Sequence, residues 1–278
     1  MSGIVKKVLA GAVAVTAVCA LGACTGGTPS GGSTGASGSS HLQQIIDRKQ
    51  INVGIIPDSP PFGQQDASGN VTGYDIDVAQ KLADALGVKL NLVKTQSTNR
   101  NAMLQSNRVD VDIDVFTVTA QRAMQVEFTI PYASISSNIM YKKDKPITGL
   151  DNLAGKTIAV ARGSSNDTLV TNNFPEATVQ RFDTAADAME AAETGKVDGV
   201  MESTVNINNA IAKDSSMAAL TLDKPLQPAL IAMGILPGDQ TWLNYLDTFI
   251  RTINASGDLQ TLYQKWFHED LPAVVAMQ

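Results

Sequence analysis

From residue 51 onward, apolar and polar positions follow two alternating periods. Short runs rich in β-branched residues predict strands, whereas apolar residues spaced three and four apart predict helices. Glycines close several of these segments, as Gly87 and Gly195 do. The predicted strands cover residues 51–56, 89–93, 109–115, 157–161 and 197–201. The predicted helices and helical turns cover residues 75–86, 100–106, 151–153 and 184–194, with two more in 241–267 separated at Gly257.

This alternation of strands and helices predicts an α/β fold with largely parallel sheets. One set of elements ends near residue 132 and a second begins near residue 145, which indicates two lobes. Two extended and mostly uncharged runs, residues 134–141 and 229–236, are suited to connect them. Two lobes joined by two hinge crossovers enclose a cleft, where small ligands commonly bind. We expect lobe 1 to comprise residues 41–132 plus 229–278 and lobe 2 to comprise residues 133–228.

The N-terminal segment has the pattern of a secretory signal: two lysines, an apolar run from Val8 to Leu21, and small residues up to Cys24. The run is shorter than the roughly 20 residues that a membrane-spanning helix needs. Its end at a cysteine resembles the lipobox of bacterial lipoproteins, which implies a signal peptide of residues 1–23 and lipid attachment at Cys24. An ordinary signal peptide that contains Cys24 is the alternative. Residues 24–40, rich in Gly and Ser, predict a flexible linker.

The charge and the rare residues disfavour several classes of function. Removal of residues 1–23 takes two lysines and no acids, so the formal net charge changes from −6 to −8. Nucleic-acid binding, which depends on clustered Lys and Arg, is disfavoured. The only cysteines are Cys19 and Cys24, so the globular part forms no disulfide. His41 and His268 lie far apart and are expected on the surface, and no glycine-rich nucleotide motif is present, so no metal or other cofactor is expected.

A series of short motifs follows the order of the chain. They are Pro60-Pro61-Phe62, Gly73-Tyr74-Asp75-Ile76-Asp77-Val78-Ala79, Asn107-Arg108-Val109-Asp110, Thr117-Val118-Thr119-Ala120-Gln121-Arg122, Phe128-Thr129-Ile130-Pro131-Tyr132, Leu153-Ala154-Gly155-Lys156, Gly163-Ser164-Ser165, Gly195-Lys196-Val197-Asp198 and Lys265-Trp266-Phe267. Together they resemble the bacterial extracellular solute-binding proteins of family 3 over residues 51–267. Each motif alone is weak, but the ordered set is specific.

The resemblance implies a periplasmic-binding-protein-like type II fold. It also implies a receptor that binds a small polar amino acid between its lobes and delivers it to the permease of an ABC transporter. A monomer without enzyme activity is implied as well. With the lipobox, the expected location is extracytoplasmic, with the protein anchored as a lipoprotein to the outer face of the cell membrane.

The resemblance further implies ligand-binding roles for particular residues. Arg122 matches an arginine whose planar guanidinium can hold an α-carboxylate through two parallel hydrogen bonds. Thr117 matches a hydroxyl beside it, and Ser165 enters a helix whose N-terminus suits an anion. Phe62 would stack on the apolar part of the ligand. The alternatives are a surface salt bridge between Arg122 and Glu127 and a core position for Phe62.

This chain departs from the family pattern where the ligand ammonium would be bound. The usual aspartate is Ser203 here, and Glu202 precedes it. A one-residue shift would bring Glu202 to the ligand in place of Ser203, whereas a strand of strict period two would turn Glu202 to the opposite face. We expect Asp114, the last acid of the run from Asp110, to replace the missing carboxylate and to bind the ammonium or a cationic side chain of the ligand. The alternative is that Asp114 pairs with Arg100 or caps a turn.

The identity of the ligand depends on a second polar segment. Ser97-Thr98-Asn99-Arg100 matches a segment that supplies a serine and an arginine to the side-chain carboxylate in members that bind acidic amino acids. Those members carry a further basic residue where this chain has Ile56, and several binders of basic ligands carry a tyrosine where it has Ser59. The sequence therefore favours a polar or acidic amino acid.

Two other functions are compatible with the same fold. One is a sensory or divergent module whose cleft takes a ligand other than an amino acid, which the departure at Ser203 keeps open. The other is a dehydratase-like enzyme in which Glu202 or Asp114 acts as a general acid.

Overall fold

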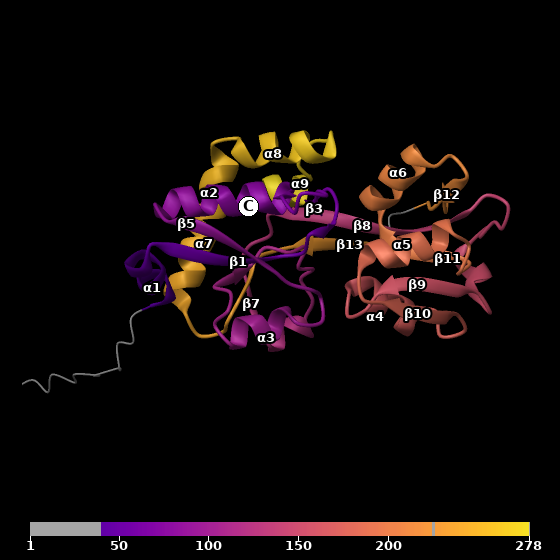
Figure 1. Ribbon diagram of the computed structural model, residues 1–278, viewed down its shortest axis with the longest axis horizontal. Coiled ribbons are helices and arrows are strands. Elements are labelled where there is room, and N and C mark those ends of the chain that lie inside the picture. The colour runs from indigo at the N-terminus through magenta and orange to yellow at the C-terminus, as the bar shows by residue number, and fades with distance from the viewer. Residues whose placement is uncertain (1–39, 224–225, 278) are drawn as a thin grey trace, which may run out of the picture. The chain divides into compact units, whose positions relative to one another are not determined.

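The computed structural model describes residues 40–223 and 226–277 (Figure 1). The predicted signal peptide, Cys24 and most of the predicted linker lie outside the described residues. Within the described part of the chain, no helix combines the length and the apolar character that crossing a membrane requires.

The first of two large sheets has the strand order β5-β1-β6-β14-β7. Strand β1 pairs in parallel with β5 and β6, whereas β14 pairs antiparallel with β6 and β7. The strands are β1 (Gln50–Ile55), β5 (Lys89–Lys94), β6 (Val111–Asp112), β7 (Glu127–Phe128) and β14 (Gly234–Ile235).

Helices of this first lobe bury an apolar stripe against the sheet, with Ile51, Val53, Leu82 and Leu246 fully buried. The helices are α1 (His41–Arg48), α2 (Tyr74–Leu86), α3 (Arg100–Gln105), α7 (Gln240–Ala255), α8 (Asp258–Phe267) and α9 (Ala273–Ala276). A small antiparallel sheet follows β1 and consists of β2 (Asp58–Ser59), β3 (Gly63–Gln65) and β4 (Val71–Thr72).

The second large sheet has the order β10-β9-β11-β8-β12, and β13 also pairs with β8. Its strands are β8 (Ala133–Lys142), β9 (Thr157–Ala161), β10 (Thr178–Phe182), β11 (Gly199–Ser203), β12 (Met217–Ala219) and β13 (Leu226–Ile231). Helices α4 (Ser165–Asn173), α5 (Ala185–Glu193) and α6 (Thr204–Lys213) belong to this second lobe, and the 3₁₀ turn η2 (Leu150–Leu153) precedes β9.

Two antiparallel strands connect the lobes. Ala133 at the start of β8 pairs with Ile231 at the end of β13, so the two crossovers lie side by side (Figure 1). The two predicted extended runs thus form paired connections. Both sheets are mixed rather than largely parallel, because the crossover strand β8 enters the second sheet antiparallel to its neighbours and β14 returns antiparallel into the first.

The predicted strand 109–115 is reduced to the two residues of β6. Val115 has a left-handed backbone (φ 56°), which takes the chain out of the extended conformation. Asp110 at the other end serves as an anchor for α1, because its carboxylate accepts from Arg48 and lies 2.6 Å from His41 Nε2. His41 is therefore half-buried in an interaction and is not the solvated side chain that was expected.

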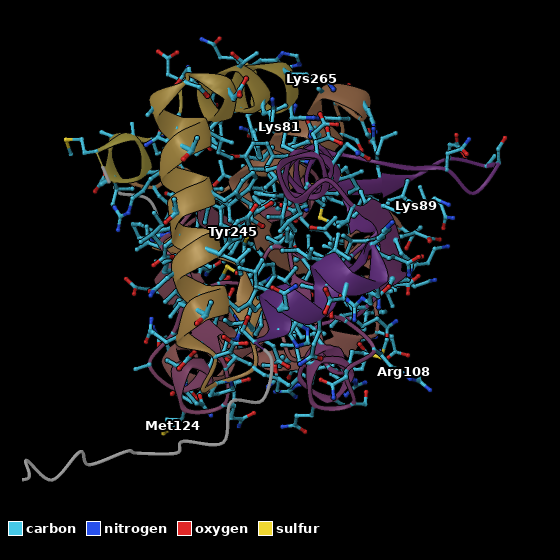
Figure 2. All side chains as sticks on the ribbon, turned by 90° about the vertical axis from the view of Figure 1, so that its left-hand side faces the viewer. Lys81, Lys89, Arg108, Met124, Tyr245 and Lys265 are labelled. Atoms are coloured by element: carbon cyan, nitrogen blue, oxygen red, sulfur yellow. The ribbon has the colours of Figure 1, made fainter. Side chains whose placement is uncertain are left out.

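Helices α2 and α8 are joined by ion pairs at their exposed edge. Lys81 Nζ lies 3.1 Å from the carboxylate of Asp258, and Lys265 Nζ lies 2.7 Å from that of Asp77. Figure 2 labels Lys81 of α2 and Lys265 of α8, the two lysines of these ion pairs. Exposed pairs of this kind each stabilise a fold by about 1 kcal/mol or less, so the packing of the apolar faces dominates.

Candidate functional site

A pocket with about 630 Å³ of empty space, part of it open to solvent, lies where residues of both lobes meet. The first lobe contributes residues from the loop after β1, from the start of α3 and from the loops around β6. The second contributes the start of α4, the start of α5 and the end of β11. Seven of the residues singled out from the sequence line it, namely Ser97, Arg100, Asp114, Thr117, Arg122, Ser165 and Glu202.

Arg122 begins the 3₁₀ turn η1 (Arg122–Met124) and reaches both lobes. Its Nη1 donates to the Thr117 carbonyl oxygen at 2.9 Å, and its Nη2 donates to the Gly163 carbonyl oxygen at 3.1 Å. Among the described residues it forms no ion pair, so the alternative salt bridge with Glu127 is not observed. Burial, and next the nearby Arg100 charge, lowers the pKa of Arg122 to about 10. The pocket thus contains a cation that forms no ion pair with a carboxylate of residues 40–223 or 226–277.

The start of α4 faces the same pocket. Ser164 is the N-cap, and its hydroxyl accepts from the Asp167 N–H at 3.1 Å. Ser165, the first helical residue, has its hydroxyl 3.3 Å from that of Thr117. Because the first N–H groups of a helix lack partners within the helix, this end is suited to bind an anion beside Arg122.

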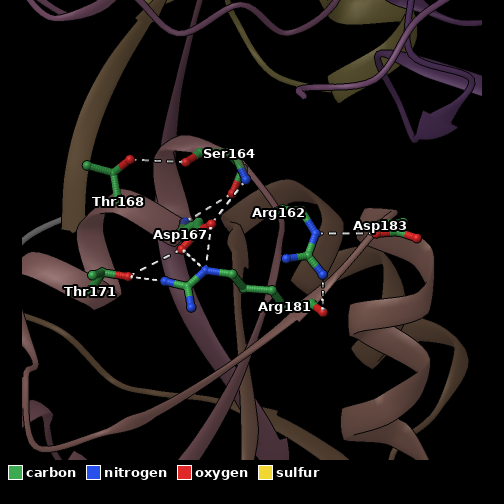
Figure 3. Close-up of polar contacts among 8 residues, drawn as sticks. Arg162, Ser164, Asp167, Thr168, Thr171, Arg181 and Asp183 are labelled. Carbon is green, nitrogen blue, oxygen red and sulfur yellow. Dashed lines mark hydrogen bonds and ion pairs between the residues drawn. The ribbon is translucent and has the colours of Figure 1, made fainter. Parts of the chain in front are cut away.

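A polar network holds the loop before α4 in place (Figure 3). The Asp167 carboxylate accepts from the Gly163 N–H at 3.0 Å and from Arg181 Nε at 2.9 Å. Thr171 donates to Asp167 and accepts from Arg181, so the network extends along the first turns of the helix. Gly163 has φ +70°, a left-handed conformation that favours glycine. These contacts fix the carbonyl that Arg122 binds.

Asp114 and Arg100 form a buried ion pair beneath the pocket. Asp114 Oδ1 accepts from Arg100 Nη1 at 2.9 Å and its Oδ2 accepts from the Thr95 hydroxyl at 3.1 Å. Arg100 also lies over the Phe116 ring, 3.8 Å from its centroid. Burial raises the pKa of Asp114, and the Arg100 charge opposes this. The geometry agrees with the alternative in which Asp114 pairs with Arg100, and it leaves neither charge uncompensated.

Glu202 and Ser203 both lie at the end of β11, but Glu202 lines the pocket whereas Ser203 caps a helix. Ser203 is buried as the N-cap of α6, where its hydroxyl accepts from the Asn206 N–H at 3.2 Å, and it is not among the residues that line the pocket. Glu202 is 7% exposed and lines the pocket, with Oε1 accepting from the Ser203 N–H at 2.7 Å. Burial raises the pKa of Glu202, an effect that these hydrogen bonds oppose. Glu202 and Ser203 both still pair with β8, so their side chains lie on opposite faces, and it is Glu202 rather than Ser203 whose side borders the pocket.

Phe62 belongs to the core and not to the pocket lining. It is 1% exposed and packs edge-on against Phe267 and Tyr74, with ring centroids 5.0 and 6.0 Å apart. The chain segment just before it does reach the pocket. This placement agrees with the core alternative for Phe62.

Several residues that line the pocket were not predicted from the sequence to belong to the site. Asp58 lies in β2, directly after the carboxyl end of the parallel strand β1, and Asp183 and Thr184 precede α5. Ligands of open α/β sheets bind outside the carboxyl ends of the strands, and this rule applied to residues 51–56 points to Asp58. Within the described residues, no group of His, Cys, Asp and Glu is arranged to hold a metal ion.

Comparisons with known proteins agree with this geometry. The chain is 27% identical to the ABC transporter glutamine-binding protein of Bacillus subtilis, over 93% of this chain and 96% of that one. It is 26% identical to the L-cystine-binding protein of Escherichia coli, over 83% and 87% of the two chains. Among solved structures, a mutant of ArgBP from T. maritima matches with a TM-score of 0.76 and 29% identity, covering 82% of this chain and 100% of that one.

One relative is an enzyme: the cyclohexadienyl dehydratase of Pseudomonas aeruginosa is 24% identical over 84% of this chain and 88% of its own length. The type II fold expected from the sequence is confirmed by the structural matches. The sequence profile of the bacterial extracellular solute-binding proteins, family 3, matches residues 51–269. The chain therefore belongs to this family of extracellular solute-binding proteins, as its ordered motifs predicted.

Proposed function

We propose that the protein binds a free amino acid in the pocket between its lobes and delivers it to the permease of an ABC transporter. The observation that carries this proposal is Arg122, a half-buried cation beside the N-terminus of α4 that has no carboxylate partner in the part of the chain that the structure describes. An α-carboxylate would accept two parallel hydrogen bonds from its guanidinium and further ones from the start of the helix. Because Arg122 and Ser165 come from different lobes, the same carboxylate would favour their approach.

The lobes that close on the ligand are residues 41–132 plus 229–278 and residues 133–228. Support comes from the crossovers, because β8 begins at Ala133 and β13 ends at Ile231. Thr117 and Ser165 provide hydroxyls next to the α-carboxylate of the ligand. Glu202 provides the carboxylate that binds the ligand ammonium, a group that Ser203 lacks. The protein acts as a monomer and returns its ligand unchanged.

Export and anchoring complete the proposal. A signal peptide of residues 1–23 is removed and Cys24 carries the lipid, so the receptor stays at the outer face of the cell membrane. Mass spectrometry of the purified protein tests this, with lipid expected on Cys24. A Cys24→Ala variant is expected to appear in the growth medium, and its retention in the membrane fraction contradicts the anchor.

The central test is a thermal-shift screen of all common amino acids on the full chain, purified in mild detergent and freed of bound ligand by unfolding and refolding. A ligand that binds only the native state adds about 2.7 kcal/mol of stability at a hundredfold excess over Kd. Selective stabilisation by one or a few related amino acids is expected, and a uniform absence of stabilisation contradicts the proposal. Mass spectrometry of the bound fraction after a day distinguishes a receptor, which yields the same molecule, from an enzyme.

A further inference from the structure

The charges that line the pocket do not balance. Its lining includes four carboxylates and two guanidinium groups, which belong to Asp58, Asp114, Asp183, Glu202, Arg100 and Arg122. In a site partly shielded from water, an unpaired charge is costly, so each of these groups is expected to find a partner in the protein or in a ligand.

Two of the carboxylates already have partners. Asp114 pairs with the buried Arg100 at 2.9 Å. Asp183 lies 3.4 Å from Arg162, whose side chain is half exposed, in the contact drawn in Figure 3. Within the described residues, Asp58, Glu202 and Arg122 form no ion pair. The pocket therefore offers one free cation and two free carboxylates to a ligand.

The two free carboxylates come from different lobes and act on each other. Asp58 is part of β2 in the first lobe, and Glu202 ends β11 in the second. Burial raises the pKa of Asp58, and the charge of Asp187 at the start of α5 adds to this effect. Burial is also the main cause that raises the pKa of Glu202, and the charge of Asp58 contributes. A positive group between Asp58 and Glu202 would relieve this repulsion across the pocket.

We infer that the ligand is a basic amino acid, a molecule with one carboxylate and two cationic groups. Its α-carboxylate binds Arg122, and its two cationic groups are shared by Asp58 and Glu202. This inference rests on the proposed function and names the class of amino acid. It replaces the polar or acidic ligand expected from the sequence, because Arg100, the residue that favoured an acidic side chain, is neutralised by Asp114.

The same charge balance disfavours acidic amino acids, neutral amino acids and simple amines as ligands. An acidic amino acid brings two carboxylates to a pocket with one free cation, so its side chain would face Asp58 or Glu202. A neutral amino acid leaves one of these carboxylates without a cation. An amine that lacks the α-carboxylate leaves Arg122 unpaired. Only a basic amino acid compensates all three groups.

The test is isothermal titration calorimetry of the refolded full chain with L-arginine, L-lysine, L-glutamine and L-glutamate. L-arginine or L-lysine is expected to bind at least tenfold more tightly than L-glutamine and at least a hundredfold more tightly than L-glutamate. Tighter binding of L-glutamine or L-glutamate overturns this inference and leaves the proposed function standing. Absence of binding by every common amino acid overturns both.

Variants of Asp58 and Glu202 distinguish a direct role of these carboxylates in ligand selectivity from a general effect of the protein's net charge. Asp58→Asn and Glu202→Gln are each expected to reduce the ratio of arginine affinity to glutamine affinity by tenfold or more. This ratio is measured on the folded fraction, so a loss of stability does not imitate it. Asp84→Asn removes one charge from an exposed position on α2 and is expected to change the ratio by less than twofold. An unchanged ratio in both pocket variants overturns the inference.

Discussion

The Arg122 guanidinium donates a hydrogen bond of 3.1 Å to the Gly163 carbonyl oxygen, so a residue of the first lobe is bonded to the loop that begins α4 in the second. A second hydrogen bond of the guanidinium, 2.9 Å long, goes to the Thr117 carbonyl oxygen. Both acceptors are neutral, and neither compensates the charge as a carboxylate would. A ligand carboxylate that reached Arg122 would meet a cation whose position is already fixed from both sides of the pocket.

Replacement of Arg122 by lysine separates charge from geometry. Arg122→Lys keeps a cation but loses the planar fork, so an amino acid is expected to bind at least tenfold more weakly. Arg122→Gln loses the charge as well, and a hundredfold loss is expected, which corresponds to about 2.8 kcal/mol. Calorimetry with the amino acid and with its decarboxylated amine measures the effect. Equal losses for both ligands would contradict a role of Arg122 in binding the carboxylate.

Replacement of Phe62 tests whether this ring belongs to the core or to the ligand. Because Phe62 is buried against Phe267 and Tyr74, Phe62→Ala is expected to lower the free energy of unfolding by about 3–5 kcal/mol. Affinity per folded molecule is expected to change by less than threefold. Urea unfolding gives the first quantity and calorimetry well below the melting temperature gives the second. A large loss of affinity at unchanged stability would instead assign Phe62 to the ligand.

The family and the two-lobed α/β fold class could be predicted from the sequence alone, whereas the exact lobe boundaries and the ligand-binding residues stay predictions. Thr117 and Arg122 were singled out because their motif resembles that of the family. Helix α2 and strand β9 follow clear periods between breakers, which are local features that the pattern of neighbouring residues determines. The start of α4 is of the same kind, because Gly163 and the capping Ser164 mark it in the sequence.

The partners of individual charges were not predictable in the same way. Whether Arg100 serves a ligand or Asp114 depends on how α3 packs against the segment after β6, and periodicity does not report that packing. Asp58 lies in a two-residue strand with no period of its own. Its importance emerges only when the fold places it in the lining of the pocket that Glu202 also borders. Local rules thus find the pocket, whereas the charge balance inside it is a property of the tertiary structure.

The Asp167 carboxylate is expected to support binding without contact to the ligand. It holds the Gly163 N–H and Arg181, and Asp167→Asn removes the charge while keeping the size of the side chain. Loss of a charge-assisted hydrogen bond at this largely buried site is expected to cost about 1–2 kcal/mol of stability. The loop that Arg122 binds loosens, so all amino acids are expected to lose affinity by a similar factor of about 3–10.

The ratios between ligands distinguish this positioning role from direct contact. Titrations of Asp167→Asn with L-arginine, L-lysine and L-glutamine are compared with those of the unmodified protein. A common factor for the three ligands supports positioning of the loop by Asp167. A change confined to one ligand would mean that Asp167 contacts it.

The most unusual buried group of the first lobe is Asp112, which has no exposed surface and whose two carboxylate oxygens lack hydrogen-bond partners in the described part of the chain. Burial, and next the charge of Asp114, raises the pKa of Asp112 well above its usual range. Below the unfolded-state pKa of about 4 both states hold the proton, so the titration of this group does not change stability there. As pH rises above this value, the unfolded chain releases its proton first, and the free energy of unfolding falls.

Asp112→Asn removes this dependence, so the variant is expected to be more stable than the unmodified protein by about 1–3 kcal/mol at pH 7. The gain is expected to vanish near pH 3.5, and urea unfolding at several pH values measures it. Asp66→Asn is the matched control, because hydrogen bonds from Asn70 lower the pKa of the exposed Asp66. This variant is therefore expected to lower the free energy of unfolding at neutral pH, and the difference is expected to fade in acid. A gain for Asp112→Asn that is the same at pH 3.5 and pH 7 would show that Asp112 does not release its proton differently in the folded and unfolded chains.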